Sequence, residues 1–185
     1  SRDNNGKLNP NDDAVKEKIH SLVDNSNNNN VEVLLKKLVK DKQILSMVIE
    51  YVASLDSATI NTLPVSISKF AVSTFKRENA DTYKNNPNFL ILVLEQGTSY
   101  QKKEVVRLMK DKINNERDLN NVVLVLDKLV TEDQQILKSL VGELEVLKDS
   151  ETVNGETKSQ IAALVTKLSF HIKKDGLINK MLAKK

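Results

Sequence analysis

Residues 121–148 constrain the fold more than any other segment, because their apolar residues recur every three or four positions. That spacing places apolar side chains on one face of an α-helix, which turns once every 3.6 residues. A polar break at 131–133 divides the segment into two helices, and Thr131 or Asp133 can cap the second. One such pair cannot bury its own apolar face, so the segment predicts neighbouring helices of the same kind.

Two further segments show the same spacing. Residues 31–55 predict a helical hairpin with a break near 40–42, and residues 88–114 predict another, with Gly97 as its stop and Thr98 or Ser99 as a cap. The sequence 34–45 also aligns with 125–137 after a single gap. Helical pairs that recur at intervals of about 30–45 residues are typical of helical-repeat proteins.

The three predicted hairpins together resemble the armadillo and HEAT families of α-solenoids. The resemblance is one of architecture and rests on residues 31–55, 88–114 and 121–148. It implies protein binding along a groove or edge of the stacked helices. The predicted fold class is therefore all-α, with helical hairpins stacked as a short α-solenoid, and an irregular α-helical bundle is the alternative.

The rest of the chain predicts a flexible N-terminal arm at 1–11, followed by a single all-helical domain at 12–185. Helical spacing places the additional helices at 12–23, 64–78 and 158–174, with a turn within 56–63 and a short turn at 177–183. Polar or glycine-containing sequence predicts loops at 25–30, 79–88 and 148–157.

Residues 89–94 leave one alternative open. Their continuous apolar run, bounded by Pro87 and Gly97, is also typical of a buried strand. A second valine-rich run at 122–126 then allows a small α/β subdomain, and an enzyme built on it is one alternative function. Helix is favoured, because no glycine-rich phosphate loop follows either run and the second run continues at helical spacing.

Composition narrows the chemistry. The chain has no cysteine, which excludes disulfides, thiol catalysis and cysteine-based zinc sites. Four Phe, three Tyr and no Trp indicate an aliphatic core and weigh against a surface on which bases stack. No apolar run approaches the roughly 18 residues of a membrane helix. The chain begins at Ser1 without an initiator Met, so we expect an excised piece of a longer chain. A location in the cytoplasm or nucleus is a separate expectation.

No residue pattern predicts a catalytic, cofactor-binding or metal site. His20 and His171 are far apart in the sequence, and neither has a second ligand at a set spacing. Glu143 and Glu145 project from different faces of one predicted helix, which does not suit shared acid–base work. The glycines form no phosphate-binding motif. We therefore expect a protein that is not an enzyme and needs no cofactor.

Lysines provide the candidate contact residues. Lys103, Arg107 and Lys110 lie at i, i+4 and i+7 of one predicted helix, with Lys102 and Lys112 nearby, and the region after Thr157 is rich in lysine. Such a stripe suits an acidic peptide or phosphates, although it is more often an ordinary solvated face. The candidate partner-binding residues are Lys102, Lys103, Arg107, Lys110, Lys173 and Lys174.

The predicted function is that of a non-enzymatic protein–protein interaction module: a scaffold, an adaptor or a co-chaperone-like unit. Its expected partner is another protein or peptide, and an acidic one would suit the lysines. Binding of nucleic acid or an anionic surface is the main alternative. It is disfavoured because arginine, which specific phosphate and base recognition prefers, is scarce. The sequence indicates no oligomeric state.

Overall fold

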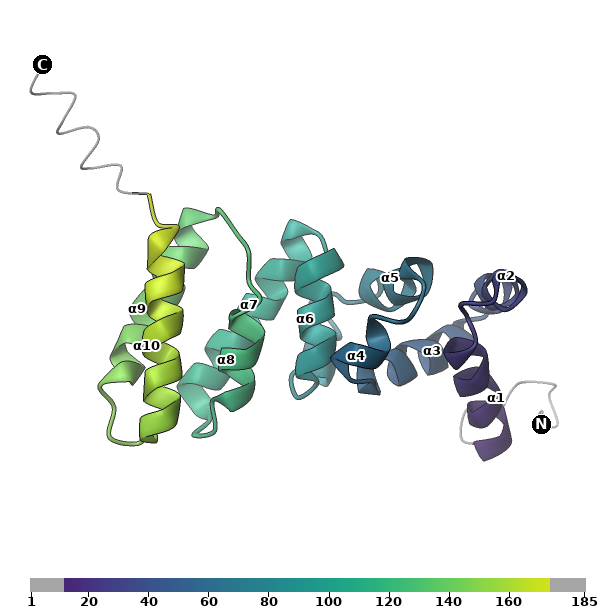
Figure 1. The fold of residues 1–185 in the computed structure, drawn as a ribbon, viewed down its shortest axis with the longest axis horizontal. Helices are drawn as coiled ribbons and strands as arrows, with labels where there is room; N and C mark the ends of the chain where they lie inside the picture. Colours follow the sequence, from purple (N-terminus) through teal and green to yellow (C-terminus); the bar gives the residue numbers. More distant parts are fainter. Residues whose placement is uncertain (1–11, 174–185) are drawn as a thin grey trace, which may run out of the picture. The chain divides into compact units, whose positions relative to one another are not determined.

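The computed structural model describes residues 12–173 and contains, within them, ten α-helices, one short 3-10 helix and no strand (Figure 1). The predicted all-α fold class is confirmed, whereas the stacking of hairpins as a solenoid stays a prediction. The elements are α1 (Asp13–Asp24), α2 (Asn29–Leu38), α3 (Lys42–Ser54), α4 (Ser57–Ile60), α5 (Val65–Ser73), η1 (Ala80–Tyr83), α6 (Pro87–Gln96), α7 (Ser99–Asn115), α8 (Asn120–Leu126), α9 (Gln134–Lys148) and α10 (Gly155–Phe170).

The chain divides into two compact units, Ser1–Glu104 and Val105–Lys185, and the boundary falls within α7. The single domain expected at 12–185 stays a prediction. The arm expected at 1–11 and the short turn expected at 177–183 lie outside the described residues.

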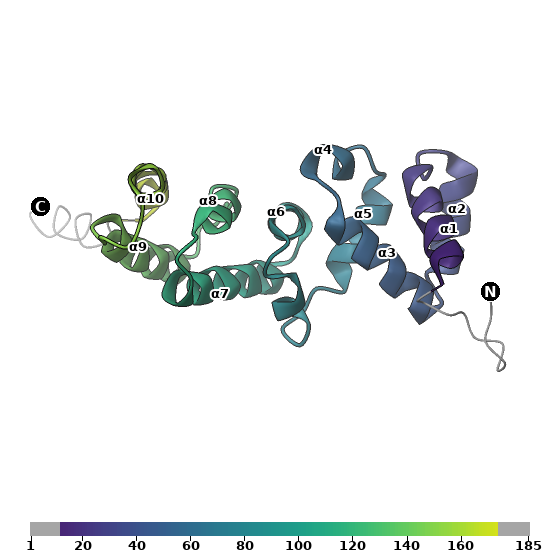
Figure 2. The same cartoon turned by 90° about the horizontal axis from the view of Figure 1, so that it is seen from below.

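In the first unit, α3 is the central helix. It packs against α1 on one side and against α5 and α6 on the other (Figure 2), so the partner of α3 is not chiefly α2, its neighbour in the predicted hairpin. Val48 and Val52 of α3 and Ile67 of α5 are fully buried. Phe75, Tyr83 and Phe89 add an aromatic cluster whose ring centroids lie 4.6 to 6.2 Å apart. Aliphatic packing and this cluster bury the faces that the helical spacing predicted.

Residues 25–28 form the predicted loop, whereas Asn29 and Asn30 at its end already belong to α2. The Asn28 side chain accepts hydrogen bonds from the amides of Asn30 (2.9 Å) and Val31 (3.4 Å), so α2 begins at Asn29. Asn27 donates to the Thr62 carbonyl at 2.7 Å. Asparagine is among the best N-cap residues because its oxygen satisfies amides that have no partner in the first turn. Low sequence complexity concealed that role.

Helix α5 ends at Ser73, five residues before the predicted end at 78. The Asn79 side chain explains the difference, because it donates to the Thr74 carbonyl (2.6 Å) and accepts from the Lys76 amide (2.9 Å). These bonds occupy backbone groups that a continuing helix would pair with each other. The connection to α6 therefore begins earlier than the loop predicted at 79–88; it contains η1 and ends before Pro87, the first residue of α6.

Residues 89–94 are helical, and all six side chains are buried in α6. The strand alternative for this run is therefore wrong, and with it the α/β subdomain within the described residues. A fully buried helix is apolar all round, which is why its sequence resembled a buried strand. After Gly97, Thr98 Oγ1 accepts from the Gln101 amide at 3.2 Å and Gln101 Oε1 accepts from the Thr98 amide at 2.9 Å. This reciprocal pair is a capping box, and the predicted Thr98 cap is confirmed.

In the second unit, α10 packs against both α9 and α8. Leu126, Leu140, Leu144 and Ile161 are fully buried in its core. The Asp133 cap is confirmed, since its carboxylate accepts from the Gln135 amide at 3.0 Å.

Two boundaries in this unit differ from prediction. Helix α8 ends at Leu126 rather than continuing through Val130, which is 79% exposed. Helix α10 begins at Gly155, three residues before the predicted start at 158, because Asn154 accepts from the Thr157 amide at 2.8 Å.

Candidate functional site

The basic residues expected to bind a partner differ in their surroundings. Lys103 is exposed, whereas Lys102, Arg107 and Lys110 are half-buried on α7. The Lys110 ammonium donates to the Ser139 hydroxyl of α9 at 2.5 Å, so this lysine already has a structural contact. The assignment of these four residues to partner binding stays a prediction.

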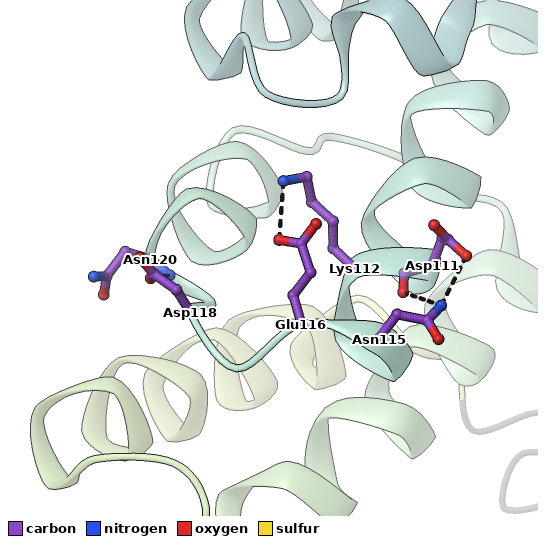
Figure 3. Close-up of polar contacts among 6 residues, drawn as sticks. All are labelled: Asp111, Lys112, Asn115, Glu116, Asp118 and Asn120. Carbon is purple, nitrogen blue, oxygen red and sulfur yellow. Dashed lines mark hydrogen bonds and ion pairs between the residues drawn. The ribbon is translucent and has the colours of Figure 1, made fainter.

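Lys112, which the sequence placed beside that stripe, is only 3% exposed. Figure 3 shows its ammonium directed toward Glu116, and the Nζ–Oε2 distance is 3.2 Å. In the same region Asn115 donates to the carbonyl (2.9 Å) and carboxylate (3.0 Å) of Asp111. Asp118 accepts from the Asn120 amide at 3.1 Å, just before α8. These contacts are local, at the end of α7 and in the turn before α8, and the buried Lys112 is not part of an exposed basic surface.

The C-terminal candidates are only partly described. Lys173 has an exposed side chain, and its backbone amide donates to Gln134 Oε1 at 2.7 Å, which ties the end of α10 to the start of α9. Lys174 lies outside the described residues. Its predicted contact role therefore stays a prediction, as does that of Lys173.

Neither histidine belongs to a candidate metal cluster, since no three His, Cys, Asp or Glu side chains that could hold a metal ion converge among residues 12–173. The His20 ring stacks on the Tyr51 ring, with centroids 3.9 Å apart and planes 12° apart. The Tyr51 hydroxyl donates to Asp24 at 2.7 Å. His171 meets Phe170 edge to face. His20 and Tyr51 thus help to join α1 to α3.

The contact with Asp24 predicts a pH effect on stability. That hydrogen bond, together with burial, raises the pKa of Tyr51 from 10.0 to about 12. The folded chain holds the phenol proton more tightly than the unfolded chain, so its contribution is full below pH 10 and is lost as the pH rises to 12. We expect Tyr51→Phe to remove one group that titrates near pH 12 from the phenolate absorbance, and Tyr100→Phe to retain it. An unchanged phenolate amplitude near pH 12 in Tyr51→Phe would contradict the assignment.

An open groove between α8 and α10 is the candidate functional site of the second unit. The two helices lie side by side (Figure 2), and the groove between them has a volume of about 730 Å³. We name it the α8–α10 groove and define it by Asn120, Asn121, Leu124, Asn154, Gln160 and Ala163. Residues 156, 160, 163 and 167 of α10 recur at helical spacing, so one face of that helix forms one wall.

Two polar contacts connect the walls of the α8–α10 groove. The Thr157 hydroxyl lies 3.4 Å from Asn120 Oδ1 at one end, and the Lys167 ammonium lies 3.2 Å from Asp127 Oδ1 at the other. The first contact joins the N-terminal ends of the two helices, and the second joins the C-terminal end of α8 to the C-terminal part of α10. The two helices therefore run in the same direction. The Lys167–Asp127 pair is about half exposed and contributes little stability. The ion pair connects the two walls of the α8–α10 groove at this end.

Side-chain amides and one exposed leucine give the α8–α10 groove its chemistry. Asn121 and Gln160 are exposed, and their side chains make no hydrogen bond to another described residue. Each amide offers a donor and an acceptor, the same pair that a peptide bond presents. Leu124 lines the groove and is 46% exposed, which leaves apolar surface for a ligand to cover. The arrangement suits an extended polypeptide.

No protein family model, curated protein or solved structure matches this chain. The resemblance to armadillo and HEAT α-solenoids therefore stays a prediction. None of the helices among residues 12–173 combines the length and apolar content needed to cross a membrane.

Proposed function

We propose that the chain is a non-enzymatic protein–protein interaction module that holds an extended segment of a partner in the α8–α10 groove. The observation that carries the proposal is the combination of unpaired amides, Asn121 and Gln160, with the half-exposed Leu124 in one open groove. In this role the chain acts as a scaffold, an adaptor or a co-chaperone-like unit in the cytoplasm or nucleus.

The amides favour recognition of the partner's main chain. An extended segment leaves its N–H and C=O groups without intramolecular partners, and a carboxamide can donate to one and accept from the other. Lys167 and Asp127 neutralise each other at one end of the groove. Affinity would come from main-chain hydrogen bonds and from an apolar side chain that covers Leu124, beside the exposed Glu156 carboxylate that also lines the groove.

The length of the groove sets the size of the segment. Its wall on α10 runs from the Asn154 cap to Lys167, which corresponds to about 20 Å along a helix at 1.5 Å per residue. An extended chain rises about 3.3 Å per residue, so roughly six residues span this wall.

The test is selection of peptides from a random library against the full chain, followed by binding measurements with two matched variants. Leu124→Asp places a charge in the α8–α10 groove, whereas Val146→Asp places one on α9 at a residue that is 75% exposed and does not line the groove. We expect Leu124→Asp to weaken binding of the selected peptides at least about tenfold, because the bound peptide would bury the new charge against apolar surface. Val146→Asp should leave binding unchanged.

Three results would contradict the proposal. The first is equal loss of binding in both variants, and the second is no loss in either. The third is catalytic turnover of a selected peptide or of another small substrate by the wild-type chain. Circular dichroism of each variant establishes that the helices are intact.

A further inference from the structure

A second open groove lies in the first unit, along the surface of α3. Its volume is about 620 Å³. We name it the α3 groove and define it by Lys42, Leu45, Ile49, Glu50, Tyr83 and Asn86. Asn86 donates to the Ala53 carbonyl at 3.4 Å, which connects the wall that follows η1 to the C-terminal end of α3.

Two opposite charges stand along the α3 groove. Lys42 and Glu50 both have exposed side chains that line it, and neither forms an ion pair with another described residue. Lys42 is the first residue of α3, where the positive end of the helix macrodipole favours acidic side chains. The first turn of α3 contains no acidic residue. The position of Lys42 is therefore not explained by the stability of its own helix.

The surface between the charges is largely apolar. Leu45 contributes half-exposed aliphatic surface beside Ile49, which is 7% exposed, and Tyr83 forms part of the opposite wall. Burial, and then the nearby Glu50 carboxylate, raise the pKa of Tyr83, so its hydroxyl is neutral over the ordinary pH range. Tyr83 is held in place by ring contacts with Phe75 and Phe89, which make it a fixed wall.

The distance between Lys42 and Glu50 sets the length and the charge pattern of a peptide that fits the α3 groove. Eight residues separate Lys42 from Glu50, which is about 12 Å along a helix. An extended peptide covers that distance in roughly four residues, and its side chains at i, i+2 and i+4 point to the same side. An acidic residue at i would meet Lys42, an apolar residue at i+2 would meet Leu45 and Ile49, and a basic residue at i+4 would meet Glu50.

We propose that the α3 groove binds an extended partner segment of the pattern acidic–x–apolar–x–basic, read in either chain direction. Complementarity to the separated charges of Lys42 and Glu50 carries this inference. It does not rest on the α8–α10 groove, which belongs to the other unit of the chain. The two sites can succeed or fail separately.

The test compares three fluorescein-labelled peptides with the full chain at low salt: Ser-Asp-Ser-Leu-Ser-Arg-Ser, the same peptide with Asp at both charged positions, and the same peptide with Arg at both. We expect the mixed peptide to bind the wild-type chain roughly fivefold more tightly than either control, as exposed ion pairs would give. Amide chemical shifts should change along α3 and η1.

Charge reversal should switch the preference. Lys42→Glu leaves two acidic groups along the groove, so the double-Arg peptide becomes the best ligand, and Glu50→Lys makes the double-Asp peptide the best. Leu124→Asp, a substitution in the other unit, should leave all three affinities unchanged.

The proposal is overturned if the three peptides bind the wild-type chain alike, or if none binds. It is also overturned if the reversed variants keep the wild-type order of preference. Amide chemical shifts of α3 residues that depend only on the concentration of the chain would show that a second copy of the chain occupies the groove. That result would overturn the proposal as well.

Discussion

Replacing Gln101 by leucine is expected to lower the free energy of unfolding by about 3 kcal/mol, since each buried polar group left unpaired costs about 1–3 kcal/mol. Gln101 is 8% exposed. Its Nε2 donates to the carbonyls of Val72 (2.6 Å) and Phe75 (2.9 Å), and its Oε1 accepts from the Thr98 amide. Leucine has a similar volume but replaces none of these bonds, so the Phe75 carbonyl and the Thr98 amide lose their partner.

The matched control for this prediction is Gln135→Leu, at an exposed residue whose side chain makes no hydrogen bond to another described residue. Its effect should stay within about 0.5 kcal/mol, as for most surface substitutions. Urea denaturation of both variants measures the difference from the midpoints, provided the slope with denaturant is unchanged. Equal effects of the two substitutions would show that the buried hydrogen bonds of Gln101 contribute little.

Replacing Gly97 by alanine is expected to destabilise the chain by about 2 kcal/mol, in the range found for overpacked positions. A Cβ atom at Gly97 would lie 2.5 Å from the Val93 carbonyl oxygen and 3.0 Å from Gln101 Oε1. The first of these atoms is backbone, so relief requires the end of α6 to move. The backbone of Gly97, with φ of −79°, is one that any residue can adopt. The expected cost is therefore steric, and it also disturbs the capping box that begins α7.

Gly142→Ala is the matched control, with the opposite expected sign. Gly142 lies in the interior of α9, and a Cβ there would meet nothing within 4 Å. Alanine should stabilise the helix by about 0.5–1 kcal/mol, because glycine loses more backbone entropy on folding. The two thermal unfolding midpoints should move in opposite directions. A Gly97→Ala midpoint at or above that of the wild-type chain would contradict the close approach to Val93.

Local sequence chemistry predicted the fold class and most helix starts. Caps at Thr98 and Asp133 follow from residue types that satisfy orphan amides, and each has that role in the structure. The continuous apolar run at 89–94 is ambiguous in isolation. The missing phosphate loop and the helical spacing that continues from the run at 122–126 favour helix, and 89–94 is helical in the structure.

Features that depend on contacts between distant residues were not predicted. The early end of α5 depends on the Asn79 side chain, and the burial of Lys112 depends on its pairing with Glu116 and on the packing of its aliphatic stem. The α8–α10 groove combines Asn121 with Gln160, which are separated by thirty-nine positions. No local period connects such residues, so only the packing of α8 against α10 brings them together. The sequence predicted lysines as the contact residues, whereas the groove combines amide side chains with Leu124, Glu156 and the Asp127–Lys167 pair.

Hydrogen–deuterium exchange of the full chain, with and without a library-selected peptide, tests the proposed binding site most directly. Binding in the α8–α10 groove should slow exchange in α8 and in α10, the helices that carry Asn121 and Gln160, and leave α7 unchanged. Slower exchange in the α7 segment that carries Lys102, Lys103, Arg107 and Lys110, without any in α8 and α10, would contradict the account and return the site to the basic stripe.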